Sequence, residues 1–251
     1  MITFYISKIP VKRRLILYAH QPSLRNGLFN YYLQSFCTEK SIGFKRFQKY
    51  TKLIHIADER FTESFNKNTR WGIRKAIKSS IICETTHHFP SFIATYNTFH
   101  QQKKLEGALT EKKLIKYGNA LIIRKAYKKN SPIVVYHSYL LDRSIQRVRT
   151  LHSVSNIWDP ELTGEERSLI GCANRYLHYQ DMLFFREQGF VTYDFGGYAY
   201  QTTDESLLGI NNFKDSFGGI LVEESNYESY PVYLIKETGN LLRRISGTPI
   251  L

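Results

Sequence analysis

The residues best suited to chemistry in this chain gather between Phe190 and Gly219. A β-rich run from Phe190 to Phe195 carries an acidic side chain, Asp194, just before the glycine pair Gly196 and Gly197. Ligands of open α/β sheets bind outside the carboxyl ends of strands, so we expect a cleft here. The glycines would let a substrate approach the backbone closely, and a simple turn of the chain is compatible with that role.

Four side chains near this point are candidate acid–base groups. Asp194 could orient or deprotonate a substrate amine, or it could bond the N–H groups of the glycine turn. His152 ends a predicted strand and could be a base, or a histidine that its surroundings satisfy. Tyr193 and Tyr198 could protonate a leaving group, although 18 tyrosines in the chain favour packing roles.

A basic segment from Thr62 to Lys78 is the second candidate region. Its apolar spacing predicts a helix with Thr62 as N-cap. Basic side chains fall on neighbouring turns with no acid between them, namely Lys67, Arg70, Arg74, Lys75 and Lys78. A solvated face is the usual meaning of such a run, but the unrelieved repulsion favours a surface facing an anion. Arg70, Arg74 and Lys75 are therefore candidates for holding an anionic substrate or donor.

Charge is the strongest compositional signal. Lysine plus arginine number 35 and aspartate plus glutamate 22, a net charge of +13. This excess favours a nucleic acid, a phosphorylated or acidic substrate, an acidic carrier protein or anionic lipid headgroups as partner, with a generally basic surface as the alternative.

Other classes of protein are disfavoured by the sequence. The three cysteines are scattered and form no Cys-x-x-Cys pair, so we expect reduced thiols and no metal site. No apolar run approaches the roughly 18 residues of a membrane span, and the first residues lack a signal-peptide layout. We therefore expect a cytoplasmic protein without a transmembrane segment.

The order of elements predicts a mixed α/β sheet. Residues 1–61 read as an N-terminal β-rich extension, with a short helix at Leu28–Phe36. Residues 62–251 then carry a helix, a strand, two helices, a three-stranded meander, a long helix and the Phe190 strand, followed by a helix and a last strand. The meander and the long helix are expected at Ala120–Tyr127, Ile133–Leu141, Ile145–Ser155 and Arg167–Gln188. Pairing should change from antiparallel to parallel after the meander.

This order is similar to the GNAT acyltransferase fold, and four segments resemble the FemABX family of peptidoglycan-bridge aminoacyl transferases. The segments are Arg70-Trp-Gly-Ile-Arg-Lys-Ala-Ile-Lys78, Ala173-Asn-Arg-Tyr-Leu-His-Tyr-Gln-Asp181, Tyr193-Asp-Phe-Gly-Gly197 and Gly209-Ile-Asn-Asn-Phe-Lys-Asp-Ser-Phe-Gly-Gly219. Bridge-forming transferases carry two GNAT-like units. The resemblance implies one such unit here, at residues 62–251, after a reduced N-terminal half.

The resemblance implies transfer of an activated acyl or aminoacyl group to an amine. The acceptor would be an anionic nucleotide- or lipid-linked sugar or peptide of the cell envelope, with peripheral contact to an anionic membrane. Phe213 and Lys214 match the family's Phe-Lys pair, which implies that Lys214 neutralises donor phosphate or developing charge. A surface lysine on a short helix is the alternative. A basic GNAT-like module that binds nucleic acid without catalysis is the second function we consider.

The acyl donor stays open at this point. In the general GNAT phosphate-binding pattern, Gly171 and Ala173 fit the last two positions, but Ser168 occupies the first. Asn174 and Arg175 stand at the expected helix start, where phosphate would lie. Acyl-CoA, acyl carrier protein and aminoacyl-tRNA, with tRNA or the carrier protein as partner, all remain candidates.

Overall fold

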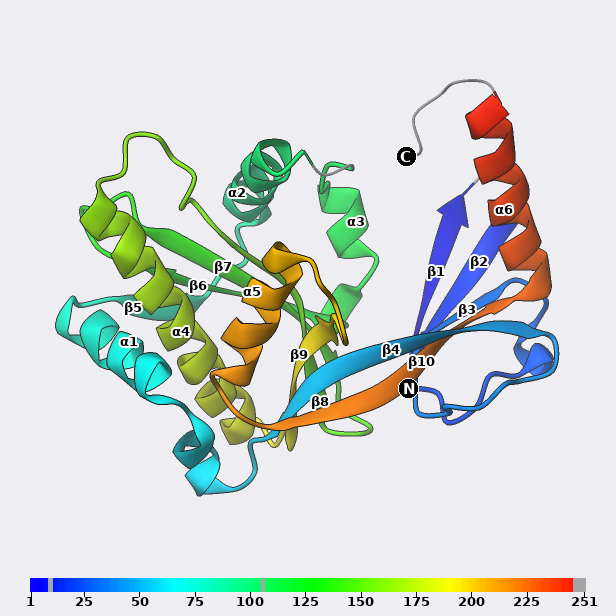
Figure 1. Ribbon diagram of the computed structural model, residues 1–251, viewed down its shortest axis with the longest axis horizontal. Coiled ribbons are helices and arrows are strands. Elements are labelled where there is room, and N and C mark those ends of the chain that lie inside the picture. The colour runs from blue at the N-terminus through cyan, green and yellow to red at the C-terminus, as the bar shows by residue number, and fades with distance from the viewer. Residues whose placement is uncertain (9–10, 105–106, 246–251) are drawn as a thin grey trace. The chain divides into compact units, whose positions relative to one another are not determined.

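The computed structural model describes residues 1–8, 11–104 and 107–245 (Figure 1). The chain forms two compact units, Met1–Thr51 with Leu221–Leu251, and Lys52–Ile220. These limits differ from the predicted boundary between residues 61 and 62. The difference arises because Ile54, Ile56 and Phe61 pack into the core of the second unit.

The first unit is a mixed sheet with one helix. Its strands lie in the order β1-β2-β3-β10-β4, with β1 antiparallel and β3 parallel to β2. The elements are β1 (Ile2–Lys8), β2 (Val11–Leu17), β3 (Asn30–Ser35), β4 (Phe44–His55), β10 (Ile220–Ser229) and α6 (Tyr230–Ile245). The helix expected at Leu28–Phe36 is wrong. Asn30, Tyr32 and Gln34 are buried in alternation, which is the period of a strand.

The second unit holds the rest of the mixed sheet, in the order β4-β9-β8-β7-β6-β5. Neighbours from β5 to β8 pair antiparallel, whereas β8 and β9 pair parallel, as the sequence predicted. The strands are β5 (Ile82–Thr85), β6 (Leu121–Tyr127), β7 (Val134–Asp142), β8 (Arg147–Ser155) and β9 (Thr192–Tyr198). The expected α/β fold with antiparallel and parallel pairing is confirmed.

Helices cover both faces of this second sheet. Neighbouring β7 side chains point to opposite faces, so Val135 packs with residues of α1 and α4, and Tyr136 packs with residues of α2 and α3. Figure 1 shows α1 and α4 side by side. The helices are α1 (Lys67–Lys78), α2 (Phe89–Gln102), α3 (Glu111–Ile115), α4 (Gly164–Glu187) and α5 (Glu205–Asp215), with 3₁₀ turns at Leu24–Asn26 in the first unit and at Glu59–Ser64 and Gly118–Ala120 in the second.

Helix α1 begins later than the sequence predicted. Its N-cap is Asn66, whose side chain accepts a hydrogen bond from Thr69 N at 2.9 Å. Thr62, the expected cap, lies in the preceding 3₁₀ turn, where its carbonyl accepts from Phe65 N at 3.1 Å. The expectation was wrong because Asn66 offers a cap one turn further on and the 3₁₀ turn interrupts the helix.

Cys37, Cys83 and Cys172 are all free thiols. Across the described ranges, no helix combines the length and the apolar character needed to span a bilayer.

Candidate active site

The candidate site lies where β8 and β9 separate. The two strands are in parallel register only at Arg147–Arg149 of β8, opposite Thr192–Asp194 of β9. Both strands continue past this point, and a cavity of about 510 Å³ is lined by β8 residues 150–153 and β9 residues 195–197. Side chains of α4 and α5 complete its wall. A cleft therefore opens where the strand that carries Tyr193 leaves its neighbour.

Two irregularities mark the separation of the strands. Ser138 of β7 pairs with His152 and Tyr139 with Thr150, so Leu151 is an extra residue in β8 without a register partner on β7. Such a β-bulge bends its strand and re-aims the backbone. On β9, Gly196 has φ +74°, and a Cβ there would lie 3.0 Å from Thr150 O. Glycine is required at this position by its conformation and by the close approach of β8.

Helix α5 carries Lys214 to the cavity. Asp204 caps the helix by accepting hydrogen bonds from Ser206 N and Leu207 N, at 2.8 and 3.0 Å. Asn211 fixes it to the end of β9, because its side chain exchanges two hydrogen bonds with the backbone of Ala199, at 3.1 and 2.8 Å. These contacts hold Lys214 over the glycine turn.

Lys214 is a half-buried cation at the glycine turn. Its Nζ donates to Gly196 O at 3.3 Å and also to Gly197 O. Burial lowers its pKa to about 8, with Asp194 opposing this effect and Arg149 adding to it. The side chain is still mainly protonated at pH 7, and its charge is poorly solvated. An anion in the cavity would therefore interact strongly with it.

Arg149 is a second cation in this wall, and sequence reasoning missed it. It lines the cavity from β8, and its buried Nε has no hydrogen-bond partner within the described part of the chain. The Arg175 guanidinium carbon lies 5.1 Å from the centroid of the Phe213 ring, which also lines the cavity. Arg149 and Lys214 thus both give the cavity wall positive charge. Arg147 lies on the same face of β8, but its guanidinium is paired with Asp194, which leaves Arg149 as the arginine of β8 that lines the cavity.

Asp194 does not line the cavity. Its side chain is 0% exposed, and Oδ2 accepts from Arg147 Nη2 at 2.6 Å and from Nε at 3.1 Å. Oδ1 accepts from Gly196 N at 2.7 Å. Of the two roles considered for Asp194, the structure therefore shows the carboxylate accepting a hydrogen bond from the backbone at the glycine pair.

His152 reaches the cavity from beyond the bulge. Its Nδ1 lies 2.7 Å from Ser138 Oγ, and its ring packs on Phe92 and Tyr96. Burial lowers its pKa to about 4, and the positive charges of Arg149, His100 and Lys116 add to the effect. The imidazole is therefore neutral at physiological pH.

Some of the site residues predicted from the sequence line the cavity, and others lie elsewhere in the second unit. Six predicted residues line the cavity: His152, Asn174, Gly196, Gly197, Phe213 and Lys214. Tyr193 and Ala173 are fully buried. Gly171 and Arg175 border a separate hollow between α1 and α4, where Arg175 Nη1 donates to Gly171 O at 3.1 Å.

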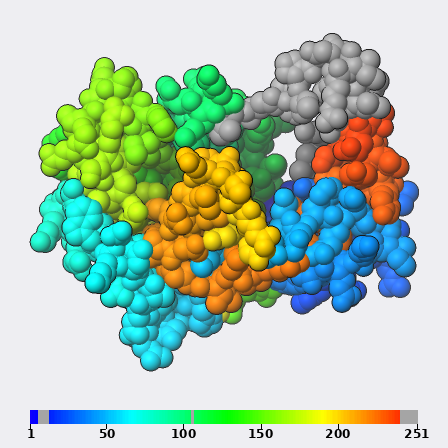
Figure 2. Space-filling model, viewed as in Figure 1, coloured from blue at the N-terminus to red at the C-terminus, as the bar shows by residue number. Residues whose placement is uncertain are grey.

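The basic residues of α1 lie outside the cavity. Arg70 and Arg74 line an open groove of about 330 Å³ on α1 and the preceding turn. Lys75 Nζ lies 3.5 Å from Ser168 Oγ and 5.1 Å from the centroid of the Trp71 ring. Figure 2 shows this helix at the surface, in cyan. Its basic side chains could meet a large anion there, but they do not face the reacting centre.

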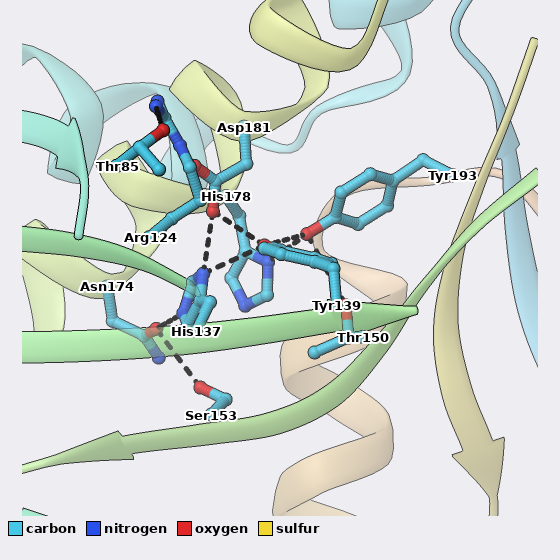
Figure 3. Close-up of polar contacts among 10 residues, drawn as sticks. All are labelled: Thr85, Arg124, His137, Tyr139, Thr150, Ser153, Asn174, His178, Asp181 and Tyr193. Atoms are coloured by element: carbon cyan, nitrogen blue, oxygen red, sulfur yellow. Dashed lines mark hydrogen bonds and ion pairs between the residues drawn. The ribbon is translucent and has the colours of Figure 1, made fainter. Parts of the chain in front are cut away.

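A buried hydrogen-bond network runs beneath the cavity (Figure 3). Asp181 Oδ1 accepts from Arg124 Nε at 2.8 Å, and Oδ2 accepts from Tyr139 Oη at 2.6 Å. Tyr139 Oη lies 2.7 Å from Tyr193 Oη, which lies 2.6 Å from His178 Nδ1. A continuous chain of hydrogen bonds therefore joins a buried carboxylate to His178, which lines the cavity.

A branch of this network passes through His137. Its Nδ1 lies 3.0 Å from Asp181 Oδ2, and its Nε2 lies 2.7 Å from Asn174 Oδ1. Sequence reasoning missed His178 and Asp181, although both stand in the segment from Ala173 to Asp181. Their spacing of three residues on a helix was the available signal, since it places them on one face. No cluster of metal-ligating side chains occurs in the described ranges.

The fold type follows from these features. A sheet whose parallel pair separates around a cavity beside a bulged strand, with helices on both faces, is a GNAT-like fold. No protein-family model matches the chain, and no curated protein matches it.

Three solved structures are similar to this chain. The crystal structure of FemX aligns with a TM-score of 0.66 and 13% identity, over 93% of this chain and 85% of that chain. The C-terminal domain of a protein assigned as a lysylphosphatidylglycerol synthetase from Agrobacterium fabrum aligns at 0.56 and 9%, over 85% and 72%. L-PGS from Bacillus licheniformis aligns at 0.54 and 12%, over 87% and 75%. The chain therefore shares its fold with these three structures.

Proposed function

We propose that this protein transfers an aminoacyl group from aminoacyl-tRNA to an amine on an anionic, nucleotide- or lipid-linked acceptor of the cell envelope. The observation that carries the proposal is the cavity between β8 and β9, where a bulged backbone and two cations face the same space. The fold shared with FemX and the lysylphosphatidylglycerol synthetase domain supports it.

The cavity contains the groups that acyl transfer needs. An amine that attacks an ester carbonyl places negative charge on the carbonyl oxygen. The backbone N–H of Leu151, which has no register partner on β7, is the candidate donor to that oxygen. Lys214 and Arg149 supply positive charge to the donor phosphate or the developing anion.

The start of α4 favours aminoacyl-tRNA over acyl-CoA as donor. A helix N-terminus that binds pyrophosphate offers free N–H groups and positive potential. Here Glu165 and Glu166 stand in the first turn, and Thr163 and Glu166 form a capping box. Ser168, at the first position of the phosphate pattern, contacts Lys75 instead. The exposed basic face of α1 suits the long phosphate backbone of tRNA.

The acceptor is proposed from charge and from the names of the neighbours. Lysylphosphatidylglycerol is an amino acid joined to an anionic phospholipid through a hydroxyl, so that neighbour supports the anionic character of the acceptor, and the FemABX resemblance, which points to peptidoglycan precursors, supports its amine. Both acceptor types are anionic and suit a chain of net charge +13. A cytoplasmic protein that contacts the anionic membrane surface peripherally would reach either one.

The test uses radiolabelled donors and defined acceptors. The purified chain is incubated with total tRNA charged with labelled amino acids, or with labelled acyl-CoA or acyl carrier protein. The acceptors with a free amine are a nucleotide-linked muramoyl peptide with a lysine side chain and vesicles containing phosphatidylethanolamine, and vesicles of phosphatidylglycerol, which has only hydroxyl groups, test whether the acceptor is an amine. We expect label in an acceptor only with charged tRNA. Transfer from acyl-CoA or carrier protein alone would overturn the proposed donor.

The same assay separates catalysis from binding. Salt-sensitive tRNA binding with no transfer from any donor would instead support a basic module that binds nucleic acid without catalysis.

A further inference from the structure

The network beneath the cavity has a fixed hydrogen-bond direction. Three contacts link four groups in series: Asp181 to Tyr139, Tyr139 to Tyr193, and Tyr193 to His178, at 2.6, 2.7 and 2.6 Å. Each contact needs one hydrogen. An ionised carboxylate only accepts, and each tyrosine hydroxyl has a single hydrogen to donate.

The carboxylate end determines the direction of these three bonds, while His137 Nδ1 lies 3.0 Å from both Tyr139 Oη and Asp181 Oδ2 as a side branch. Arg124 Nε donates to Asp181 at 2.8 Å, which favours the ionised carboxylate. Tyr139 must therefore give its hydrogen to Asp181, and Tyr193 must give its hydrogen to Tyr139. The remaining contact can form only if His178 Nδ1 carries a hydrogen and donates it to Tyr193. A neutral imidazole has one N–H, so Nε2 of His178 holds a lone pair.

His178 lies in the cavity wall, beside the proposed reaction centre. It lines the cavity with Gly196 and Lys214, and Nε2 makes no hydrogen bond to any residue in the described ranges. The aromatic rings of Phe195, Phe213 and Phe217 surround the imidazole, with centroids 4.9, 5.5 and 5.5 Å away. These rings fix the ring plane, and the hydrogen bond at Nδ1 fixes its rotation.

Charged neighbours keep the imidazole neutral between turnovers. Burial lowers the pKa of His178 well below its ordinary value, and His137, Lys214 and Arg175 add to the effect. Of the neighbouring groups, the His137 ring lies nearest, with its centroid 4.0 Å from that of His178. Tyr193 contacts His178 directly, and Asp181 is linked to it through Tyr139 and Tyr193, a series that we call the relay (Figure 3). The base is therefore unprotonated across the physiological pH range.

We propose that His178 is the catalytic base of the acyl transfer, and that Tyr193, Tyr139 and Asp181 are positioning residues that hold its Nδ1–H tautomer and leave Nε2 free to accept a proton. This inference rests on the proposed function. Sequence reasoning placed His152 and Asp194 in this role, but His152 Nδ1 contacts Ser138 Oγ, and the Asp194 carboxylate is buried against Arg147 and Gly196 N.

The proton and bond changes balance without a further reactant. The acceptor nitrogen forms a bond to the acyl carbon as His178 Nε2 takes a proton from that nitrogen. The tetrahedral intermediate then breaks the bond to the ribose oxygen, and Nε2 returns the proton to that oxygen. The products are an amide and a free tRNA hydroxyl. In the imidazolium state, Nδ1–H keeps donating toward the Asp181 carboxylate through the two tyrosines, which stabilises the charge.

The first experiment measures the tautomer directly and needs no substrate. The full chain is labelled with ¹⁵N-histidine, and His178 is assigned from its loss in His178→Asn. We expect a protonated Nδ1 and an unprotonated Nε2 in the unaltered protein. Tyr193→Phe should convert His178 toward the Nε2–H tautomer. Tyr127→Phe removes a tyrosine hydroxyl bonded to Glu84 instead, and should leave the tautomer unchanged. An Nε2–H tautomer in the unaltered protein would overturn the relay.

The second experiment measures transfer. His178→Asn keeps an N–H donor near the Nδ1 position but has no acceptor near Nε2. We expect its kcat to fall about 10²- to 10⁴-fold with little change in KM. Tyr193→Phe should lower kcat less and change the pH profile of kcat, which a purely structural role would not do.

The outcomes of the two proposals are distinguishable. Normal kcat in His178→Asn, with transfer by the unaltered chain, would overturn the role of His178 alone. Absence of transfer by the unaltered chain would overturn the proposed function and that role together. A folded His178→Asn variant is verified by its unchanged thermal transition.

Discussion

At the scale of single residues, Lys214 is the side chain whose charge state should govern activity. Its pKa is lowered to about 8, so its charge is lost as pH rises through that value. If the charge assists transfer, the rate should decline above pH 8 in the unaltered chain. In Lys214→Arg the charge persists, and the decline should move to higher pH.

A pH–rate profile of both proteins between pH 6 and 10 provides the measurement. Lys214→Ala supplies the baseline, with transfer slowed about tenfold or more at pH 7. Superimposable profiles for the unaltered chain and Lys214→Arg would contradict a role for the lysine charge.

His152 should make the protein sensitive to acid through stability. Its pKa in the folded chain is about 4, below the unfolded value near 6.5. The unfolded chain therefore binds more protons between these values, and stability falls as pH drops from 6.5 toward 4. His152→Asn should lose less stability over this window, by on the order of 1–3 kcal/mol.

Urea unfolding at pH 6.5 and pH 4.5 tests this expectation. His20 is an exposed histidine and gives a matched control, since His20→Asn should keep the full pH dependence. If the free energy of unfolding fell by the same amount between pH 6.5 and pH 4.5 in His152→Asn and in the unaltered chain, His152 would not be the group that titrates.

At the scale of elements, the site depends on two strands that stop pairing. Gly196 has φ +74°, and its missing Cβ would approach Thr150 O to 3.0 Å. Gly196→Ala should therefore destabilise the protein by about 1–3 kcal/mol. Gly197→Ala is the matched control, because a Cβ there meets no atom within 4 Å.

Chemical denaturation of both glycine variants measures the difference. A loss of stability in Gly197→Ala as large as that in Gly196→Ala would mean that local strain at the turn is not the cause. The position of Lys214 should also change in Gly196→Ala, because its Nζ bonds the carbonyl of this residue.

At the scale of the whole molecule, the net charge of +13 should appear as salt-dependent binding to tRNA. The exposed residues Arg70 and Arg74 occupy an open groove on α1. Replacing both with alanine should reduce the slope of log K against log salt concentration by about 1.5–2. In the transfer assay, the same change should mainly raise KM for charged tRNA.

Lys40→Ala/Lys49→Ala removes the same charge from exposed positions of the first unit and serves as the control. Equal slopes for the two double variants would mean that binding follows net charge and not the α1 surface. Filter binding between 50 and 300 mM salt gives both slopes.

Much of the element order was readable from local patterns. The run from Tyr193 to Gly197 located the part of β9 that borders the cavity, and the segment with Phe213 and Lys214 located the helix that faces it. Predictions from local patterns were wrong where the same segment contained residues that favour a different structure. Asn66 replaced Thr62 as a cap, and the aromatic residues of β3 formed a strand in place of a helix.

The sequence by itself determined the charge and the types and order of most elements, because these depend on residues close together in the chain. It placed a strand before Gly196 and Gly197, but β9 continues through both glycines to Tyr198. Only the tertiary structure decided which side chains face the cavity. Asp194 turned inward to Arg147, whereas Arg149 and His178 reached the wall. Contacts between distant segments made this choice: Arg147 of β8 forms an ion pair with Asp194 of β9, and α4 packs against the sheet so that His178 reaches the cavity. Such contacts depend on pairing and packing across the chain, which local sequence patterns do not specify.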